Sequence, residues 1–137
     1  MTNVPPNPRR TILLVDDEPE VLRLFRRILS AEGTQILAAG TGAAALAIAR
    51  QTGLDLVVLD VKLPDVSGTE VLRRIRRIDT GVPVIMVTGY GSAETVRASM
   101  KLGAFDYLTK PFDNQDIRRV ARQALASRAG GPVPLRA

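Results

Sequence analysis

The sequence predicts an α/β domain in which helices cover both faces of a parallel sheet. Between Thr11 and Arg128, short apolar runs alternate five times with longer stretches in which apolar residues recur at helical spacing. Several of the short runs are apolar without interruption, which favours strands buried on both faces. Short connections and right-handed crossovers then make a doubly wound sandwich the simplest arrangement. At 137 residues the chain has the size of a single domain.

Five strands are predicted, in chain order at residues 12–15, 35–39, 56–59, 84–87 and 105–108. The first, third and fourth of these runs consist only of Ile, Leu, Val and Met. The second run begins with Gln35 and the fifth contains Asp106, so these two are less apolar. We therefore expect the second and fifth strands at the edges of the sheet.

Five helices are predicted between and after these strands. Three of them carry apolar stripes that should pack against the sheet. The stripes are Val21, Leu22, Phe25, Ile28 and Leu29, then Val71, Leu72, Ile75 and Ile78, and finally Ile117, Val120, Ala121, Ala124 and Leu125. The second helix, rich in alanine, should span residues 43–49 with Thr41 as its cap, and the fourth should run from a cap at Ser92 to Leu102.

The two ends of the chain differ from the region between them. Residues 1–10 are polar and rich in proline, and residues 129–137 contain glycines and prolines, so we expect a flexible N-terminal segment and a flexible tail or linker around a domain at 11–128. The N-terminal segment lacks the apolar core of a signal peptide. No apolar run approaches the ~20 residues of a membrane span, and we therefore expect a cytoplasmic protein.

Composition excludes several kinds of chemistry. The chain contains no cysteine and no histidine, which rules out disulfides, zinc sites built on those residues and serine–histidine triads. The net charge of +5 comes largely from arginine pairs. A nucleic-acid patch is one interpretation, but no aromatic residues are interleaved to stack on bases. Solvated faces of separate helices explain the pairs better, and we expect no direct nucleic-acid binding.

Charged and polar residues gather at the predicted strand ends. Asp16 and Asp17 follow the first strand, Asp60 the third, Thr88 the fourth and Lys110 the fifth. Ligands of open parallel sheets bind beyond the carboxyl ends of the strands, so these side chains can converge. Clustered aspartates favour a hard cation such as Mg²⁺, and an amine and a hydroxyl can bind phosphate oxygens. The set therefore fits phosphoryl transfer with an aspartate as nucleophile.

Each residue also has a structural explanation when taken alone. Asp16 and Asp17 could cap the helix that begins near Pro19, and Asp60 could cap the turn that follows it. Lys110 could be a surface lysine. A structural cause does not require acids, a hydroxyl and an amine at four different strand ends, so the combination favours a functional site.

Four motifs carry a resemblance to a known family. They are ILLVDDE at residues 12–18, LVVLDVKLPDVSG at 56–68, MVTGY at 86–90 and YLTKPF at 107–112. Together they resemble the receiver domain of two-component response regulators, most of all the receivers of nitrogen-regulator-type transcriptional activators. The resemblance implies a flavodoxin-like (βα)5 fold, with a five-stranded sheet in the order 2-1-3-4-5.

The resemblance also implies a phosphorylation site and a magnesium site. Asp60 would accept a phosphoryl group from a sensor histidine kinase in a phosphorelay. Asp17 and Asp60 would bind Mg²⁺ directly together with the backbone carbonyl of Lys62, and Asp16 would assist through water. Such a chain is not an enzyme, except that it catalyses its own phosphorylation and dephosphorylation.

A switch is implied around the same site. Lys110 would bind a phosphoryl oxygen, Thr88 would move toward the phosphoryl group, and Tyr107 would follow Thr88. The Lys110–Pro111 bond would be cis. Residues 92–128 would form the output surface, with a phosphorylation-dependent homodimer as one outcome and transcriptional control as the expected role.

Three alternatives are weighed against this prediction. An aspartyl-phosphate phosphatase of the haloacid-dehalogenase type needs a second aspartate two residues after the nucleophile, where this chain has Lys62. A flavodoxin-like cofactor binder needs a phosphate loop after the first strand, where Asp17 and Glu18 have the wrong charge. A docking-only receiver would not need the complete acidic set.

Overall fold

The computed structural model describes residues 10–30, 33–89 and 91–128. The terminal segments predicted to be flexible lie outside the described residues, except for Arg10, and so does Tyr90. Arg10 differs from the prediction because it is the first residue of a strand, where its amide donates to the carbonyl of Gly33 over 2.8 Å.

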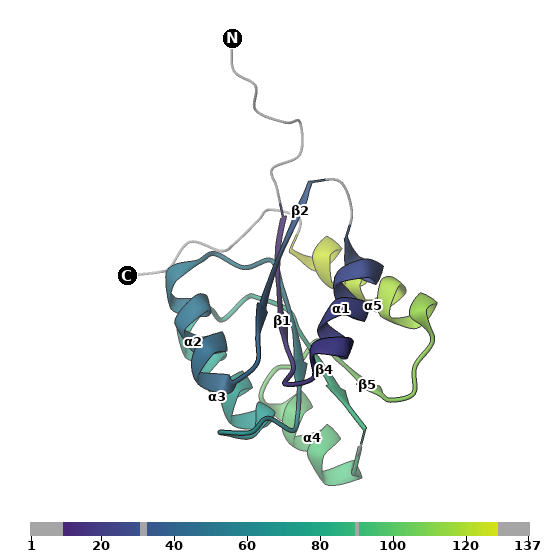
Figure 1. The fold of residues 1–137 in the computed structure, drawn as a ribbon. Helices are drawn as coiled ribbons and strands as arrows, with labels where there is room; N and C mark the ends of the chain where they lie inside the picture. Colours follow the sequence, from purple (N-terminus) through teal and green to yellow (C-terminus); the bar gives the residue numbers. More distant parts are fainter. Residues whose placement is uncertain (1–9, 31–32, 90, 129–137) are drawn as a thin grey trace.

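Five parallel strands form one sheet in the order β2-β1-β3-β4-β5 (Figure 1). The strands are β1 (Arg10–Val15), β2 (Thr34–Ala39), β3 (Leu56–Asp60), β4 (Val84–Thr88) and β5 (Asp106–Thr109). All residues of β3 and β4 are buried, whereas β2 and β5 are partly exposed. The predicted strand order and the two edge positions are confirmed.

Helices cover both faces of this sheet (Figure 1). They are α1 (Pro19–Leu29), α2 (Gly42–Gln51), α3 (Gly68–Ile78), α4 (Ala93–Lys101) and α5 (Asn114–Ser127). Alternate residues of each buried strand face opposite sides: Ile12 and Leu14 pack in the core under α1 and α5, while Leu13 and Val15 pack in the core under α2 and α3. The predicted stripes of α1, α3 and α5 lie in these two cores.

Local sequence explains where the helices begin and end. Thr41 Oγ1 accepts from the amide of Ala44 over 3.1 Å, and Ser92 Oγ accepts from the amide of Thr95 over 3.1 Å, so both predicted caps are confirmed. Gly33 follows α1 with φ +82° and Gly103 follows α4 with φ +89°, a backbone conformation that glycine adopts without strain.

The topology fixes where a site can form. From β1 the chain crosses to β2 on one side of the sheet, and from β3 it crosses to β4 on the other side. The direction in which strands are added to the sheet therefore reverses between β1 and β3. Because the strands are parallel, the carboxyl ends of β1, β3, β4 and β5 lie at the same end of the sheet. Within the three described segments, no helix is long and apolar enough to cross a membrane.

Candidate functional site

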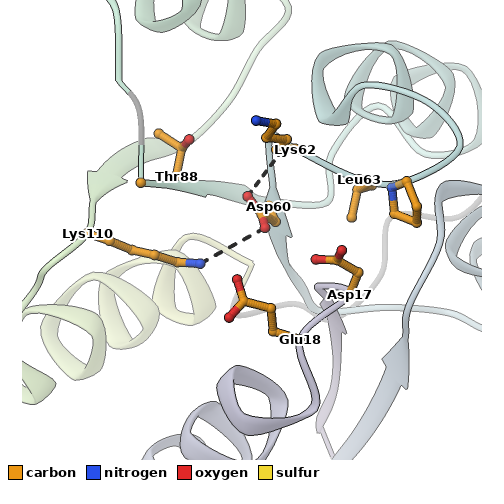
Figure 2. Close-up of a pocket in the computed structure, with 9 residues that line it drawn as sticks. Asp17, Glu18, Asp60, Lys62, Leu63, Thr88 and Lys110 are labelled. Carbon is orange, nitrogen blue, oxygen red and sulfur yellow. Dashed lines mark hydrogen bonds and ion pairs between the residues drawn. The ribbon is translucent and has the colours of Figure 1, made fainter.

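Asp60 is the last residue of the central strand β3 and lies at the end of the sheet where the carboxyl ends of the strands gather. Only 6% of the residue is exposed. Its Oδ1 accepts a hydrogen bond from the Lys62 amide over 3.1 Å, and its Oδ2 lies 4.0 Å from Lys110 Nζ (Figure 2). The carboxylate is therefore held from one side by the following turn and from another by the fifth strand end.

Asp16 follows β1 and is more deeply buried, with 1% of the residue exposed. Its Oδ2 lies 3.5 Å from Lys110 Nζ, and its Oδ1 accepts from the Glu18 amide over 2.9 Å. The Lys110 ammonium thus faces two buried carboxylates at once. The peptide bond that follows it, Lys110–Pro111, is cis.

The electrostatics of Asp60 reflect this crowding. Burial, and to a smaller extent the nearby Asp16 carboxylate, raise the pKa of Asp60, while the Lys62 amide and the Lys110 ammonium lower it, and the net result is a pKa of about 6. The single lysine does not fully compensate the cost of two buried carboxylates. A cation at this position would favour the ionised form of Asp60.

An oxygen-donor cluster adjoins the pair. Ligand atoms of Asp16, Asp17 and Glu18 all lie within 4.8 Å of one another. Figure 2 shows the Asp17 carboxylate directed toward Asp60 and the Glu18 carboxylate directed toward Lys110. Carboxylate oxygens without sulfur or imidazole suit a hard cation, so these residues fit Mg²⁺. Glu18 was missing from the predicted set, although its position directly after two aspartates was a signal for including it.

The carboxylates of Asp17, Glu18 and Asp60 line a cavity of about 340 Å³. Its walls come from four strand ends and from the loop after β3 (Figure 2). The lining residues are Asp17, Glu18, Asp60, Lys62, Leu63, Pro64, Thr88, Gly89 and Lys110. The loop residues Leu63 and Pro64 were not among the predicted site residues.

Thr88 and Tyr107 come from the neighbouring strands β4 and β5. Thr88 ends β4, is 2% exposed and lines the cavity. Burial raises the pKa of Tyr107, and the Thr88 side chain opposes this shift, which places the two hydroxyl groups close together. The Tyr107 hydroxyl is buried and makes no hydrogen bond of normal geometry to any described residue. Tyr107 therefore contacts the site through Thr88 and does not line the cavity.

The purely structural roles considered for the aspartates and for Lys110 can now be compared with the structure. Glu18, and neither aspartate, is the N-cap residue of α1, and its side chain makes no capping bond to a described residue. Asp60 does accept from the turn after β3, so its structural role and its place in the site coexist. Lys110 is no ordinary surface lysine, because its side chain is 25% exposed and its ammonium faces Asp16 and Asp60.

The fold and the site together define a class of protein. It is a doubly wound α/β domain with a pocket of carboxylates and one lysine at the point where the strand order reverses. The response regulator receiver domain matches residues 12–122 of the chain. The chain therefore belongs to the response regulator receiver family.

Individual relatives agree with this assignment. The chain is 42% identical over 107 residues to the probable transcriptional regulatory protein TcrX of Mycobacterium tuberculosis, which covers 78% of this chain and 46% of the relative. It is 38% identical to the sporulation initiation phosphotransferase F of Bacillus subtilis, over 83% of this chain and 92% of the relative. The regulatory protein AtoC of Escherichia coli, a nitrogen-regulator-like activator, is 34% identical, over 83% of this chain and 25% of the relative.

A solved structure supports the same conclusion about the fold. The CheY-like receiver domain protein of Methanospirillum hungatei superposes with a TM-score of 0.81 at 33% identity, covering 89% of this chain and 98% of that one. Among the relatives above, the chain spans less than half of TcrX and a quarter of AtoC, but nearly all of the Bacillus protein.

Proposed function

We propose that this chain is a phospho-acceptor switch in a two-component system, phosphorylated on Asp60 with the help of Mg²⁺. The observation that carries the proposal is the position of the Lys110 ammonium, which lies 3.5 Å from Asp16 Oδ2 and 4.0 Å from Asp60 Oδ2, on a residue that lines the cavity. Lysine and carboxylates in this arrangement suit a site that binds a phosphoryl group and a cation together. Response regulators work with sensor histidine kinases, and such a kinase is the proposed donor.

The proposed reaction moves one phosphoryl group. A carboxylate oxygen of Asp60 attacks phosphorus, the bond from phosphorus to the donor's histidine nitrogen breaks, and that nitrogen keeps the electron pair. With a pKa of about 6, most Asp60 carboxyls are ionised near neutral pH and able to attack. Lys110 would then bind an oxygen of the acyl phosphate. Water later hydrolyses this bond, and the domain catalyses no reaction on other substrates in this proposal.

The pocket contains oxygen atoms that could bind the cation. The carboxylates of Asp17 and Asp60 and the backbone carbonyl of Lys62 would hold Mg²⁺, and Asp16 would act through a bound water. When bound, Mg²⁺ supplies positive charge that offsets the negative charge gathering on the transferred group. The raised pKa of Asp60 supports this assignment, because it reports carboxylates that lack sufficient compensation within the protein.

The phosphoryl group would act on the domain through Thr88 and Tyr107. A dianionic group on Asp60 attracts the Thr88 hydroxyl, and Tyr107 then repacks beside it. The Thr88 side chain already lowers the pKa of Tyr107, so a movement of Thr88 would change the surroundings of the Tyr107 hydroxyl. The output surface would be α4, β5 and α5, where a homodimer could form, and the readout would be transcriptional control as in TcrX.

Phosphorylation with a small phosphodonor tests the proposal. We expect acetyl phosphate with Mg²⁺ to add one phosphoryl group per chain, and EDTA or Asp60→Asn to abolish it, as intact-mass spectrometry would show. Asp113→Asn is the matched control, because Asp113 caps α5 through the Gln115 amide and asparagine caps as well as aspartate. A label that persists in Asp60→Asn would refute the acceptor assignment.

A further inference from the structure

The loop between β3 and α3 is folded back tightly on the acceptor aspartate. The Gly68 amide donates to the Val61 carbonyl over 2.6 Å, and Lys62 pairs with Ser67 in an antiparallel bridge. A β-carbon on Gly68 would overlap the Asp60 carbonyl oxygen and lie 2.7 Å from Val61 Cα. The base of the loop is therefore fixed directly against the backbone of Asp60.

The tip of the loop is held by a different part of the chain. Asp65 Oδ1 accepts from the Gly42 amide over 2.8 Å, and Asp65 Oδ2 accepts from the Ala43 amide over 3.0 Å. These are the first two amides of α2, which have no partner inside the helix. A carboxylate at this position also complements the positive end of the helix dipole.

Packing shows that this contact is built into the fold. A β-carbon on Gly42 would overlap Val66 Cγ1 and lie 2.9 Å from Val71 Cγ2. Only glycine lets the start of α2 approach the loop this closely. Both carboxylate oxygens of Asp65 are engaged, although the side chain stands at the surface and does not line the cavity.

We propose that Asp65 is a positioning residue for the phosphorylation site, because it ties the cavity-lining segment 62–64 to the N-terminus of α2. The segment runs from the base of the loop, fixed at Asp60, to the tip, fixed by Asp65. Without the tip contact, the segment would lose its two hydrogen bonds to α2 and would keep the base of the loop and the packing of Leu63 and Val66 against the core. This inference rests on the proposed function, since it assigns Asp65 a role in holding the Mg²⁺ ligand at Lys62.

Two alanine variants separate positioning from helix capping. Asp65→Ala removes both loop-to-helix bonds, whereas Thr41→Ala removes the bond to the Ala44 amide and leaves the loop attached. We expect Asp65→Ala to raise the Kd for Mg²⁺ roughly tenfold, the lower end of the range for outer-shell partners. Asp65→Asn keeps one acceptor oxygen and should fall between Asp65→Ala and wild type. Thr41→Ala should stay within about twofold of wild type.

A second readout does not depend on the metal. We expect hydrogen exchange of the backbone amides at residues 61–67 to accelerate in Asp65→Ala and to stay unchanged in Thr41→Ala. Wild-type Mg²⁺ affinity and wild-type exchange in a folded Asp65→Ala protein would overturn the positioning role. If Asp65→Ala does not fold, Asp65→Asn carries the same comparison. If wild type itself neither binds Mg²⁺ nor accepts a phosphoryl group, the proposed function fails, and the exchange comparison still decides whether Asp65 holds the loop.

Discussion

Arg128, just after α5, pairs with Asp79, just after α3, through both of its terminal nitrogens. Nη1 donates to Oδ1 over 3.1 Å, and Nη2 donates to Oδ2. The Arg128 side chain is 2% exposed, which is rare for arginine, and Asp79 also accepts from the amides of Gly81 and Val82. One carboxylate thus joins the end of α3, the approach to the start of β4 and the end of α5, whereas the Asp60 pocket lies where the strands end.

Breaking this pair should destabilise the domain. We expect Arg128→Leu to lower the free energy of unfolding by about 3 kcal/mol, because the partly buried Asp79 carboxylate loses both hydrogen bonds from the Arg128 guanidinium. Arg119→Leu is the control: Arg119 forms an exposed pair with Asp116, and its loss should cost under about 1 kcal/mol. Urea denaturation of both variants measures the difference. Equal midpoints for the two would contradict the prediction.

The same pair should give the domain an acid-sensitive component. Burial alone would raise the pKa of Asp79, but the hydrogen bonds from Arg128, Gly81 and Val82 hold it below its ordinary value of 3.8. Asp79 therefore adds stability that is complete above pH 3.8 and is lost as the pH falls through the lower folded-state value. In Asp79→Asn, stability should fall less steeply over this acidic window. An unchanged slope would show that Asp79 does not titrate with unfolding.

The contacts between Arg128 and Asp79 and between Asp65 and the start of α2 could not be predicted from the sequence, whereas much of the fold could. The edge strands, the caps at Thr41 and Ser92 and the convergence of Asp16, Asp60 and Lys110 follow from local patterns and from the geometry of parallel sheets, and the full strand order follows from the family resemblance. The pairs Arg128–Asp79 and Asp65–Gly42 join residues 49 and 23 positions apart, respectively, and no periodicity links them. Only the packed structure shows which helix ends and loops meet.

Asp60 should make the domain less stable as the pH rises, which is opposite to Asp79. Its folded-state pKa of about 6 lies above the ordinary 3.8, so the folded state binds the extra proton and stability falls between these two values. After discounting for solvent screening, we expect Asp60→Asn to be about 1–2 kcal/mol more stable than wild type at pH 7 without metal. Saturating Mg²⁺ should stabilise wild type and reduce this gap. Thermal unfolding at pH 4 and pH 7, with and without Mg²⁺, measures it, and an Asp60→Asn protein that is never the more stable would disprove the prediction.

Lys110 should have opposite effects on the cation and on the phosphoryl group. Its ammonium neutralises Asp16 and Asp60 in the same pocket that would hold Mg²⁺, so the two positive charges compete. We expect Lys110→Met to bind Mg²⁺ more tightly, by roughly fivefold, and yet to be phosphorylated more slowly. Titration calorimetry and the acetyl phosphate assay measure the two quantities. Arg122→Met, on the outer face of α5, controls for the loss of one charge, and weaker Mg²⁺ binding in Lys110→Met would contradict the competition.

Thr88 and Tyr107 can be tested through the ionisation of the tyrosine itself. In a Tyr90→Phe background Tyr107 is the one remaining tyrosine, so the tyrosinate absorbance reports it alone. Burial should hold its pKa above the ordinary 10.0, and Thr88→Val should raise it further, because the Thr88 side chain now lowers it. Tyr107→Phe should change the free energy of unfolding by no more than about 1 kcal/mol, since the buried hydroxyl interacts with Thr88 but makes no hydrogen bond of normal geometry to a described residue. A pKa that does not move in Thr88→Val, or a clear loss of stability in Tyr107→Phe, would mean that the hydroxyl is anchored elsewhere. In that case Tyr107 would not be free to follow Thr88 when Asp60 is phosphorylated.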